Sequence, residues 1–314
     1  MSRFTASILA ATALLGVLLW VVISMAVEFA RAPAEPLPMP TDDPVIQLDP
    51  ELPRVASRDE LVAWLDSNAL DGELLVDDLQ AWLYVNGFPD QHLEIASDEI
   101  SIPSRIDSLD DAALLILACN GDLHAMQMLG DRSLQIDDPL EALNWYDRAV
   151  VNGSLFAMLR VADLITTLSD PALAEFVSNA AWQEAIDQQR AETPAPRERA
   201  LAWSLAAVIA GGYGVIDPAQ ADRINILTEQ LDVVGVARAC DTAQAYVLDA
   251  ATARRAQGGA VFSSQQPALA LTVANPEELI PCDIPLVPLV PLNGCRTYEF
   301  VSQERLLNAW VCGV

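Results

Sequence analysis

Apart from its carboxylates, the chain contains few residues that could do chemistry. Histidine occurs only at positions 92 and 124, and all 17 basic residues are arginine. Without lysine there is no P-loop lysine, Schiff-base lysine or Ser-Lys dyad, and the sequence shows no phosphate loop, nucleophile elbow or zinc spacing. We therefore expect a non-enzymatic protein with no cofactor and no small-molecule substrate. The abundant carboxylates leave open an acid/base pair, the chemistry that a cell-wall hydrolase uses.

One acidic loop has oxygen ligands in the order that binds calcium. Asp66, Asn68 and Asp71 precede a turn glycine, Gly72, and Asp78 follows, which resembles an EF-hand loop. The loop departs from that pattern by one extra residue before the Asp-Gly and by Asp instead of Glu at its end. A polar turn between two helices explains the same residues, so we expect no metal and keep calcium as the alternative.

The five cysteines are typical of an exported protein with disulfide bonds. Cys282 and Cys295 bracket a proline-rich loop, which predicts a disulfide between them; a Cys295–Cys312 bond is the alternative. Cys119 and Cys240 lie in predicted helices, where we expect buried thiols. An odd number of cysteines leaves at least one that is unpaired or that pairs between chains.

The composition is strongly acidic, with a formal net charge of -27 and a pI near 4.1. Nucleic acids and anionic lipid surfaces bind basic proteins, so neither is an expected partner. Acidic residues are densest between positions 41 and 111, which indicates a solvated surface or attraction of a basic partner.

The first 31 residues contain an uncharged apolar run, over positions 4–27, that is long enough to span a bilayer. Arg3 precedes this run, which favours a single-pass helix in a bacterial inner membrane with the remaining chain in the periplasm. A cleaved signal peptide, and hence secretion to the periplasm, is the alternative. Residues 32–57 are rich in Pro and Asp and predict an extended tether.

Two amphipathic helices follow within residues 58–109, which we interpret as an acidic helical cap. Residues 110–258 then carry a pattern of small residues around large aromatic ones, and Asp138-Pro139 is a helix start signal. Part of the pattern recurs 58 positions later, with an apparent insertion over 170–198. The pattern consists of Ala125, Leu129, Gly130, Ala142, Trp145, Tyr146, Ala149 and Gly153, and the recurrence of Ala200, Trp203, Ala207 and Gly211.

These residues resemble the Sel1-like repeat, a relative of the tetratricopeptide repeat. The resemblance implies an all-α fold, an α-solenoid of stacked helix hairpins whose groove binds other proteins. The segment 259–314 is Pro-rich and, from its cysteines, expected to contain a disulfide, and we predict a short final helix over 302–310.

The resulting hypothesis is a membrane-tethered envelope adaptor or scaffold that binds a protein partner through the repeat groove. The first alternative is an exported acidic inhibitor, of the immunity type, that neutralises a basic envelope enzyme. The second is the carboxylate-based cell-wall hydrolase. A stoichiometric, salt-sensitive complex with a basic enzyme would separate the inhibitor from a scaffold. Loss of activity on changing a single carboxylate, with folding intact, would indicate the hydrolase.

Overall fold

The computed structural model describes residues 52–89, 106–170, 172, 179–212, 215, 218–259, 267–273, 280–282, 295–302 and 305–312. The predicted membrane segment over 1–31 and most of the predicted tether over 32–57 lie outside these residues. Within the described ranges, no helix is both long enough and apolar enough to cross a membrane.

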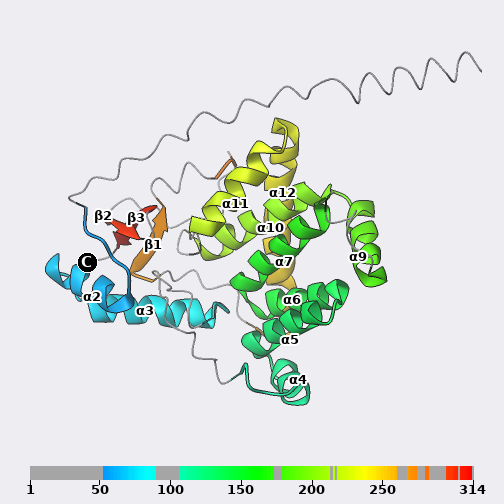
Figure 1. Cartoon of the computed structure of the whole chain (residues 1–314), viewed down its shortest axis with the longest axis horizontal. Coiled ribbons are helices and arrows are strands. Elements are labelled where there is room, and N and C mark those ends of the chain that lie inside the picture. The colour runs from blue at the N-terminus through cyan, green and yellow to red at the C-terminus, as the bar shows by residue number, and fades with distance from the viewer. Residues whose placement is uncertain are drawn as a thin grey trace, which may run out of the picture. The chain divides into compact units, whose positions relative to one another are not determined.

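The described residues form ten helices and three strands (Figure 1). The helices are α2 (Arg58–Ser67), α3 (Gly72–Val85), α4 (Asp111–Cys119), α5 (Leu123–Gln135), α6 (Pro139–Asn152), α7 (Leu155–Ser169), α9 (Ala180–Ala191), α10 (Pro196–Gly211), α11 (Pro218–Glu229) and α12 (Val233–Ala256). The strands are β1 (Leu269–Val273), β2 (Arg296–Ser302) and β3 (Arg305–Val311). The prediction of a mainly helical fold is confirmed, whereas the prediction of an all-α fold is wrong.

Short polar side chains begin most of these helices. In eight of the ten described helices, a Ser, Asp or Asn before the first turn accepts a hydrogen bond from a backbone N–H of that turn. Each such cap contributes about 1 kcal/mol, and an aspartate also interacts favourably with the helix dipole. Helix capping therefore accounts for part of the acidic composition. The aspartate caps are Asp71, Asp110, Asp122, Asp138 and Asp232.

Helices α4 to α7 pack as successive neighbours, α4 on α5, α5 on α6 and α6 on α7. Helix α10 then packs directly on α7, and α12 packs on both α10 and α6. Helix α9, which comes from the predicted insertion over 170–198, lies beside α6 and α7. Helix α10 therefore packs on α7 although the predicted insertion separates the two helices in sequence.

The pair α2–α3 connects to the other helices at the end of α3. The N–H of Leu155, at the start of α7, donates to the carbonyl of Asn86 at 2.9 Å. The rings of Phe88 and Phe156 lie 5.5 Å apart in the same region. Phe88 belongs to the hydrophobic core and Phe156 packs against it, so the predicted cap and the helices of the predicted repeat region share one core.

The C-terminal residues form an antiparallel sheet of order β1-β3-β2, where the sequence predicts a helix over 302–310. Leu307 of β3 pairs with Phe300 of β2 and with Val273 of β1. The buried apolar residues of β3, Leu307, Ala309 and Val311, recur at every second position, which is the period of a strand, and Asn308 between them is buried too. The helix prediction is wrong because a short apolar run fits either period, and only pairing with distant residues decides between them.

The first described residues lie against this sheet. Arg54 pairs with Val301 of β2 in a parallel bridge. On α2, the ring of Trp64 lies 5.0 Å from that of Phe300. Helix α3 and helix α11 both contact β1. The sheet therefore contacts both the helices that precede the predicted repeats and a helix within the predicted repeat region.

The disulfide predicted between Cys282 and Cys295 is wrong. Cys282 is bonded to Cys240 of α12, and Cys295 is bonded to Cys312. The second bond follows from the sheet, because Cys295 and Cys312 continue the register of β2 and β3 and their Cα atoms lie 4.2 Å apart. Cys119 has no disulfide partner and is exposed, in contrast to the predicted buried thiol.

Candidate partner-binding site

Eleven of the twelve predicted repeat-motif residues lie in the core. Ala125, Ala142, Tyr146, Ala149, Ala200 and Ala207 are fully buried, and Leu129, Gly130, Trp145, Gly153 and Gly211 are buried as well. Small side chains at these positions allow neighbouring helices to approach closely. The motif residues therefore act mainly in packing. Trp203 is the exception, since part of its surface is exposed.

Gly130 and Tyr146 account for part of the motif's spacing. A Cβ atom on Gly130 would lie 2.5 Å from a ring carbon of Tyr146, so only glycine leaves room for the ring. The Tyr146 hydroxyl donates to Asp131 at 2.5 Å, and Arg160 donates to the same carboxylate at 2.6 Å. Burial, together with the charge of Asp131, raises the pKa of Tyr146 and keeps the phenol protonated. This network fixes α5, α6 and α7 together.

Trp203 forms an aromatic pair with Tyr246 of α12. The two rings are stacked, with centroids 4.1 Å apart and an angle of 19° between their planes. Both side chains are partly exposed. The equivalent tryptophan of the first motif, Trp145, is buried, and the guanidinium of Arg148 lies 4.5 Å from its ring centroid. Of the two motif tryptophans, Trp203 is thus the one that presents an aromatic pair at the surface.

Two carboxylates act electrostatically on Tyr246 of this pair. The charges of Glu192 and Asp147 both raise the pKa of Tyr246, in addition to the larger effect of burial, while Arg199 lowers it. Glu192 is paired with Arg199 at 3.5 Å. Asp147, in contrast, forms no hydrogen bond or ion pair with any described residue. We call Asp147, Glu192, Trp203 and Tyr246 the acidic-aromatic site.

The ionised form of Asp147 is disfavoured at this position. Burial by the surrounding helices raises its pKa to about 6, and the charge of Glu192 adds to the shift. The residue itself is exposed, so solvent moderates this shift. A carboxylate that is accessible, unpaired and destabilised in this way gains from a cationic ligand, which would supply the missing opposite charge.

The acidic-aromatic site has the groups that recognise a basic side chain. A guanidinium or ammonium group is attracted to the face of Trp or Tyr by about 0.5–2 kcal/mol. A carboxylate beside the ring adds a charge-assisted hydrogen bond. The same raised pKa is also a property of carboxyl groups that act as general acids, so Asp147 is the described residue that best fits the hydrolase alternative.

We expect Asp147→Asn to stabilise the protein at alkaline pH. The pKa of Asp147 is raised above the ordinary value near 3.9, so its ionisation costs stability above about pH 6 and costs progressively less below it. Because solvent screens this side chain, the expected gain is about 1 kcal/mol at pH 8, shrinking as the pH falls to about 5. Urea unfolding of the variant and the wild type at both pH values measures this gain. The same difference in unfolding free energy at pH 8 and pH 5 would show that charge is not the cause.

The candidate calcium ligands do not converge on a common centre. Asp66 accepts a hydrogen bond from the N–H of Gly72 at 2.8 Å, and Asp71 caps α3. Asn68 donates to a carbonyl of α2, while Asp78 accepts from the N–H that precedes β1. Among the described residues, no group of three or more His, Cys, Asp or Glu side chains is placed to hold a metal ion. The hydrogen bonds of Asp66, Asn68 and Asp71 are local to the turn between α2 and α3, whereas that of Asp78 joins α3 to the segment before β1.

The sequence does not reveal the acidic-aromatic site. Asp147 directly follows the motif residue Tyr146, but Glu192 comes from the insertion and Tyr246 from a helix outside both motif copies. Trp203 belongs to the predicted motif, although only as a packing residue. One signal is present: Trp203 and Trp145 occupy equivalent positions, and only Trp145 is followed three residues later by an arginine that can cover its ring.

No family model matches the chain, and comparisons with curated proteins and with solved structures give no match. The Sel1-like assignment therefore stays a prediction from the motif residues.

Proposed function

We propose that the protein is a non-enzymatic, membrane-tethered adaptor of the bacterial envelope. It binds a protein partner through the surface of its Sel1-like helix hairpins, and the acidic-aromatic site receives a basic side chain of that partner. The single observation that carries this proposal is the unpaired carboxylate of Asp147, whose charge acts on Tyr246 of the partly exposed Trp203–Tyr246 pair.

The overall charge supports a basic partner. A net charge of -27 attracts positively charged proteins and accelerates their association. The site itself contains two carboxylates, and the cation beside it, Arg199, is already held by the carbonyl oxygens of Pro194 and Gln189. A cation supplied by the partner therefore does not have to displace Arg199 from Asp147.

The two disulfides support the envelope location. Disulfides persist in oxidising compartments such as the bacterial periplasm and are rare in the cytosol. The uncharged run over 4–27 supports membrane attachment of the exported domain. Removal of this run by a signal peptidase would give the secreted form, with the same binding surface.

An acidic inhibitor is the second candidate, and the same site favours it. A basic envelope enzyme could present an arginine or lysine to Asp147, and its inhibition would distinguish an immunity-type protein from a scaffold. For the hydrolase alternative, Asp147 would need a second catalytic carboxylate. Glu192, whose charge raises the pKa of Asp147, is a candidate, but its carboxylate is already paired with Arg199.

Affinity capture from native membranes tests the proposal. We expect the tagged full-length protein to retain a basic envelope protein that elutes progressively as salt is raised, because salt screens exposed charge pairs. An assay of the partner's own activity, with and without this protein, then separates inhibitor from scaffold. Retention that does not change with salt would contradict recognition of a basic segment.

A further inference from the structure

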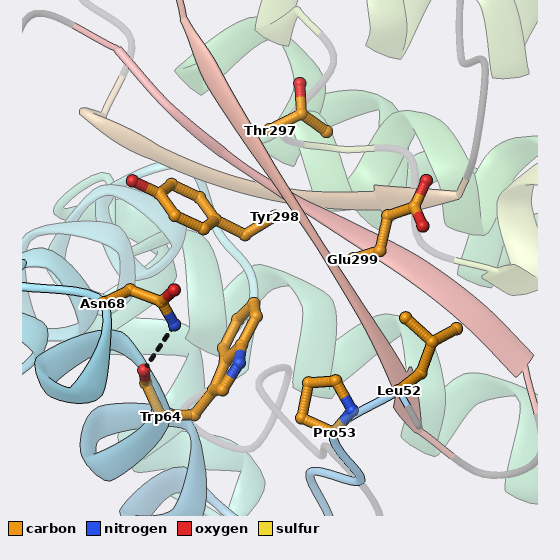
Figure 2. Close-up of a pocket in the computed structure, with 7 residues that line it drawn as sticks. All are labelled: Leu52, Pro53, Trp64, Asn68, Thr297, Tyr298 and Glu299. Atoms are coloured by element: carbon orange, nitrogen blue, oxygen red, sulfur yellow. Dashed lines mark hydrogen bonds between the residues drawn. The ribbon is translucent and has the colours of Figure 1, made fainter. Parts of the chain in front are cut away.

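A second feature suited to binding lies at the edge of the sheet, apart from the acidic-aromatic site. It is an open groove of about 460 Å³ (Figure 2). Three segments contribute to it: the first described residues, helix α2 and strand β2. The lining residues are Leu52, Pro53, Trp64, Asn68, Thr297, Tyr298 and Glu299.

Strand β2 is an edge strand, because the sheet has the order β1-β3-β2. The chain already adds a short segment to this edge. The N–H of Val301 donates to the carbonyl of Pro53 at 2.8 Å, and the N–H of Val55 donates to the carbonyl of Val301 at 3.0 Å. The backbone groups of Val301 therefore face away from β3. The backbone N–H and C=O groups of every second residue in a strand point to the same side. The backbone groups of Thr297 and Glu299 therefore point to this outer edge as well.

Pro53 interrupts the parallel pairing that residues 53–55 make with β2. In a parallel ladder that continues from Val301, the next bond would run from the N–H of residue 53 to the carbonyl of Glu299. Proline has no N–H, so this donor does not exist. No described residue pairs with Thr297 or Glu299 on the outer side of β2.

The side chains of the groove indicate what would lie along this edge. Trp64 and Tyr298, whose ring centroids are 6.3 Å apart, line the groove together with the apolar side chains of Pro53 and Leu52. Glu299 is exposed and forms no ion pair with a described residue. The described lining contains no basic residue. Side chains alternate along a strand, so those of a bound segment would alternately contact the rings of Trp64 and Tyr298 and lie near Glu299.

We propose that the edge of β2 at Thr297 and Glu299 binds an extended, alternating apolar and basic segment of a protein partner by strand addition. The segment continues the interface that residues 53–55 already form with Val301. Its backbone pairs with Thr297 and Glu299, its apolar side chains lie on Trp64 and Tyr298, and its basic side chains face Glu299. This site is separate from the acidic-aromatic site and does not depend on the function proposed for it.

A pair of substitutions at one position tests the backbone contact. Thr297→Pro removes the outward N–H and keeps every β2–β3 hydrogen bond, because proline is tolerated where the N–H of an edge strand faces outward. Thr297→Val keeps the N–H and removes only the hydroxyl. The probe is a capped hexapeptide of alternating arginine and valine, titrated calorimetrically into the full-length protein.

We expect Thr297→Pro to weaken peptide binding at least tenfold and Thr297→Val to change it less than twofold, with both variants melting as the wild type does. A peptide of alternating glutamate and valine should not bind. Equal affinity for the proline variant and the wild type would overturn the proposal. A wild-type protein that does not bind the peptide would overturn it as well. If the amide of Thr297 is then also protected from hydrogen exchange, the chain's own residues occupy the edge.

The variant Asp147→Asn/Trp203→Ala separates this inference from the proposed function. Peptide affinity should be unchanged in that variant if the peptide binds at β2. A loss of affinity there, with none in Thr297→Pro, would place the basic peptide at the acidic-aromatic site and overturn strand addition.

Discussion

Gly130→Ala lowers the free energy of unfolding by about 2–3 kcal/mol. The added Cβ would lie 2.5 Å from one ring carbon of Tyr146 and 2.9 Å from another. The ring has little freedom to move, because it is fully buried and its hydroxyl is held by Asp131. Overpacking of a rigid core site usually costs about 1–3 kcal/mol, and movement of this ring also disturbs the ion pair of Asp131 with Arg160.

Gly235→Ala is the matched control. Gly235 also lies in a helix, but the atoms nearest to an added Cβ there begin at 3.2 Å and are the side-chain oxygens of Asp232 and Glu198. Alanine favours helix over glycine by about 1 kcal/mol, so this variant should be neutral or slightly stabilised. Urea unfolding of both variants measures the difference. Equal stability of the two would show that Gly130 is not a close-packing residue and would remove the physical basis of the motif.

Cys240→Ala/Cys282→Ala lowers the free energy of unfolding by about 3–4 kcal/mol. The disulfide closes a loop with a sequence separation of 42 residues, and the entropy of the unfolded chain rises when that loop is opened. In the folded protein the bond holds the segment 280–282 against α12, where Cys240 is buried. We expect the melting temperature to fall and the segment following α12 to become sensitive to protease.

Cys119→Ala serves as the control for this variant, because Cys119 is exposed and has no disulfide partner. Its stability should match the wild type under non-reducing conditions. Peptide mapping without reductant should recover Cys240 linked to Cys282 and Cys295 linked to Cys312. A Cys282–Cys295 peptide, or a double variant as stable as the wild type, would contradict the observed pairing.

The helices could be predicted because their signals are local. The Asp138-Pro139 start predicts α6, which begins at Pro139 with Asp138 as its cap and ends before Gly153 in a left-handed conformation. Caps, proline and glycine act within one or two turns, so a single sequence is enough to place them.

The sheet and the disulfides could not be predicted because they depend on distant residues. Whether Leu306 and Leu307 belong to a helix or a strand is decided by pairing with β2 and with the more distant β1. The same pairing places Cys295 opposite Cys312 and leaves Cys282 to bond Cys240 of α12. The acidic-aromatic site could not be predicted for the same reason, because its residues come together only when α6, α9, α10 and α12 pack.

The cost of ionising Asp147 links the stability of the protein to its proposed function. An unpaired carboxylate with a raised pKa makes the free protein less stable at neutral pH, and a basic ligand relieves that cost. A residue that lowers stability while remaining accessible is expected at a binding site more than at a packing site. Binding should accordingly weaken as the pH falls through about 6, where Asp147 takes up a proton.

The most direct test of the binding proposal is the yield of the captured partner from native membranes for two matched variants. Asp147→Asn/Trp203→Ala alters the acidic-aromatic site. Asp59→Asn/Trp182→Ala removes one carboxylate and one indole elsewhere, and Asp59 is 97% exposed. We predict at least a fivefold loss of partner with the first variant and less than a twofold change with the second. Equal yields from both variants would contradict the assignment of partner binding to this site.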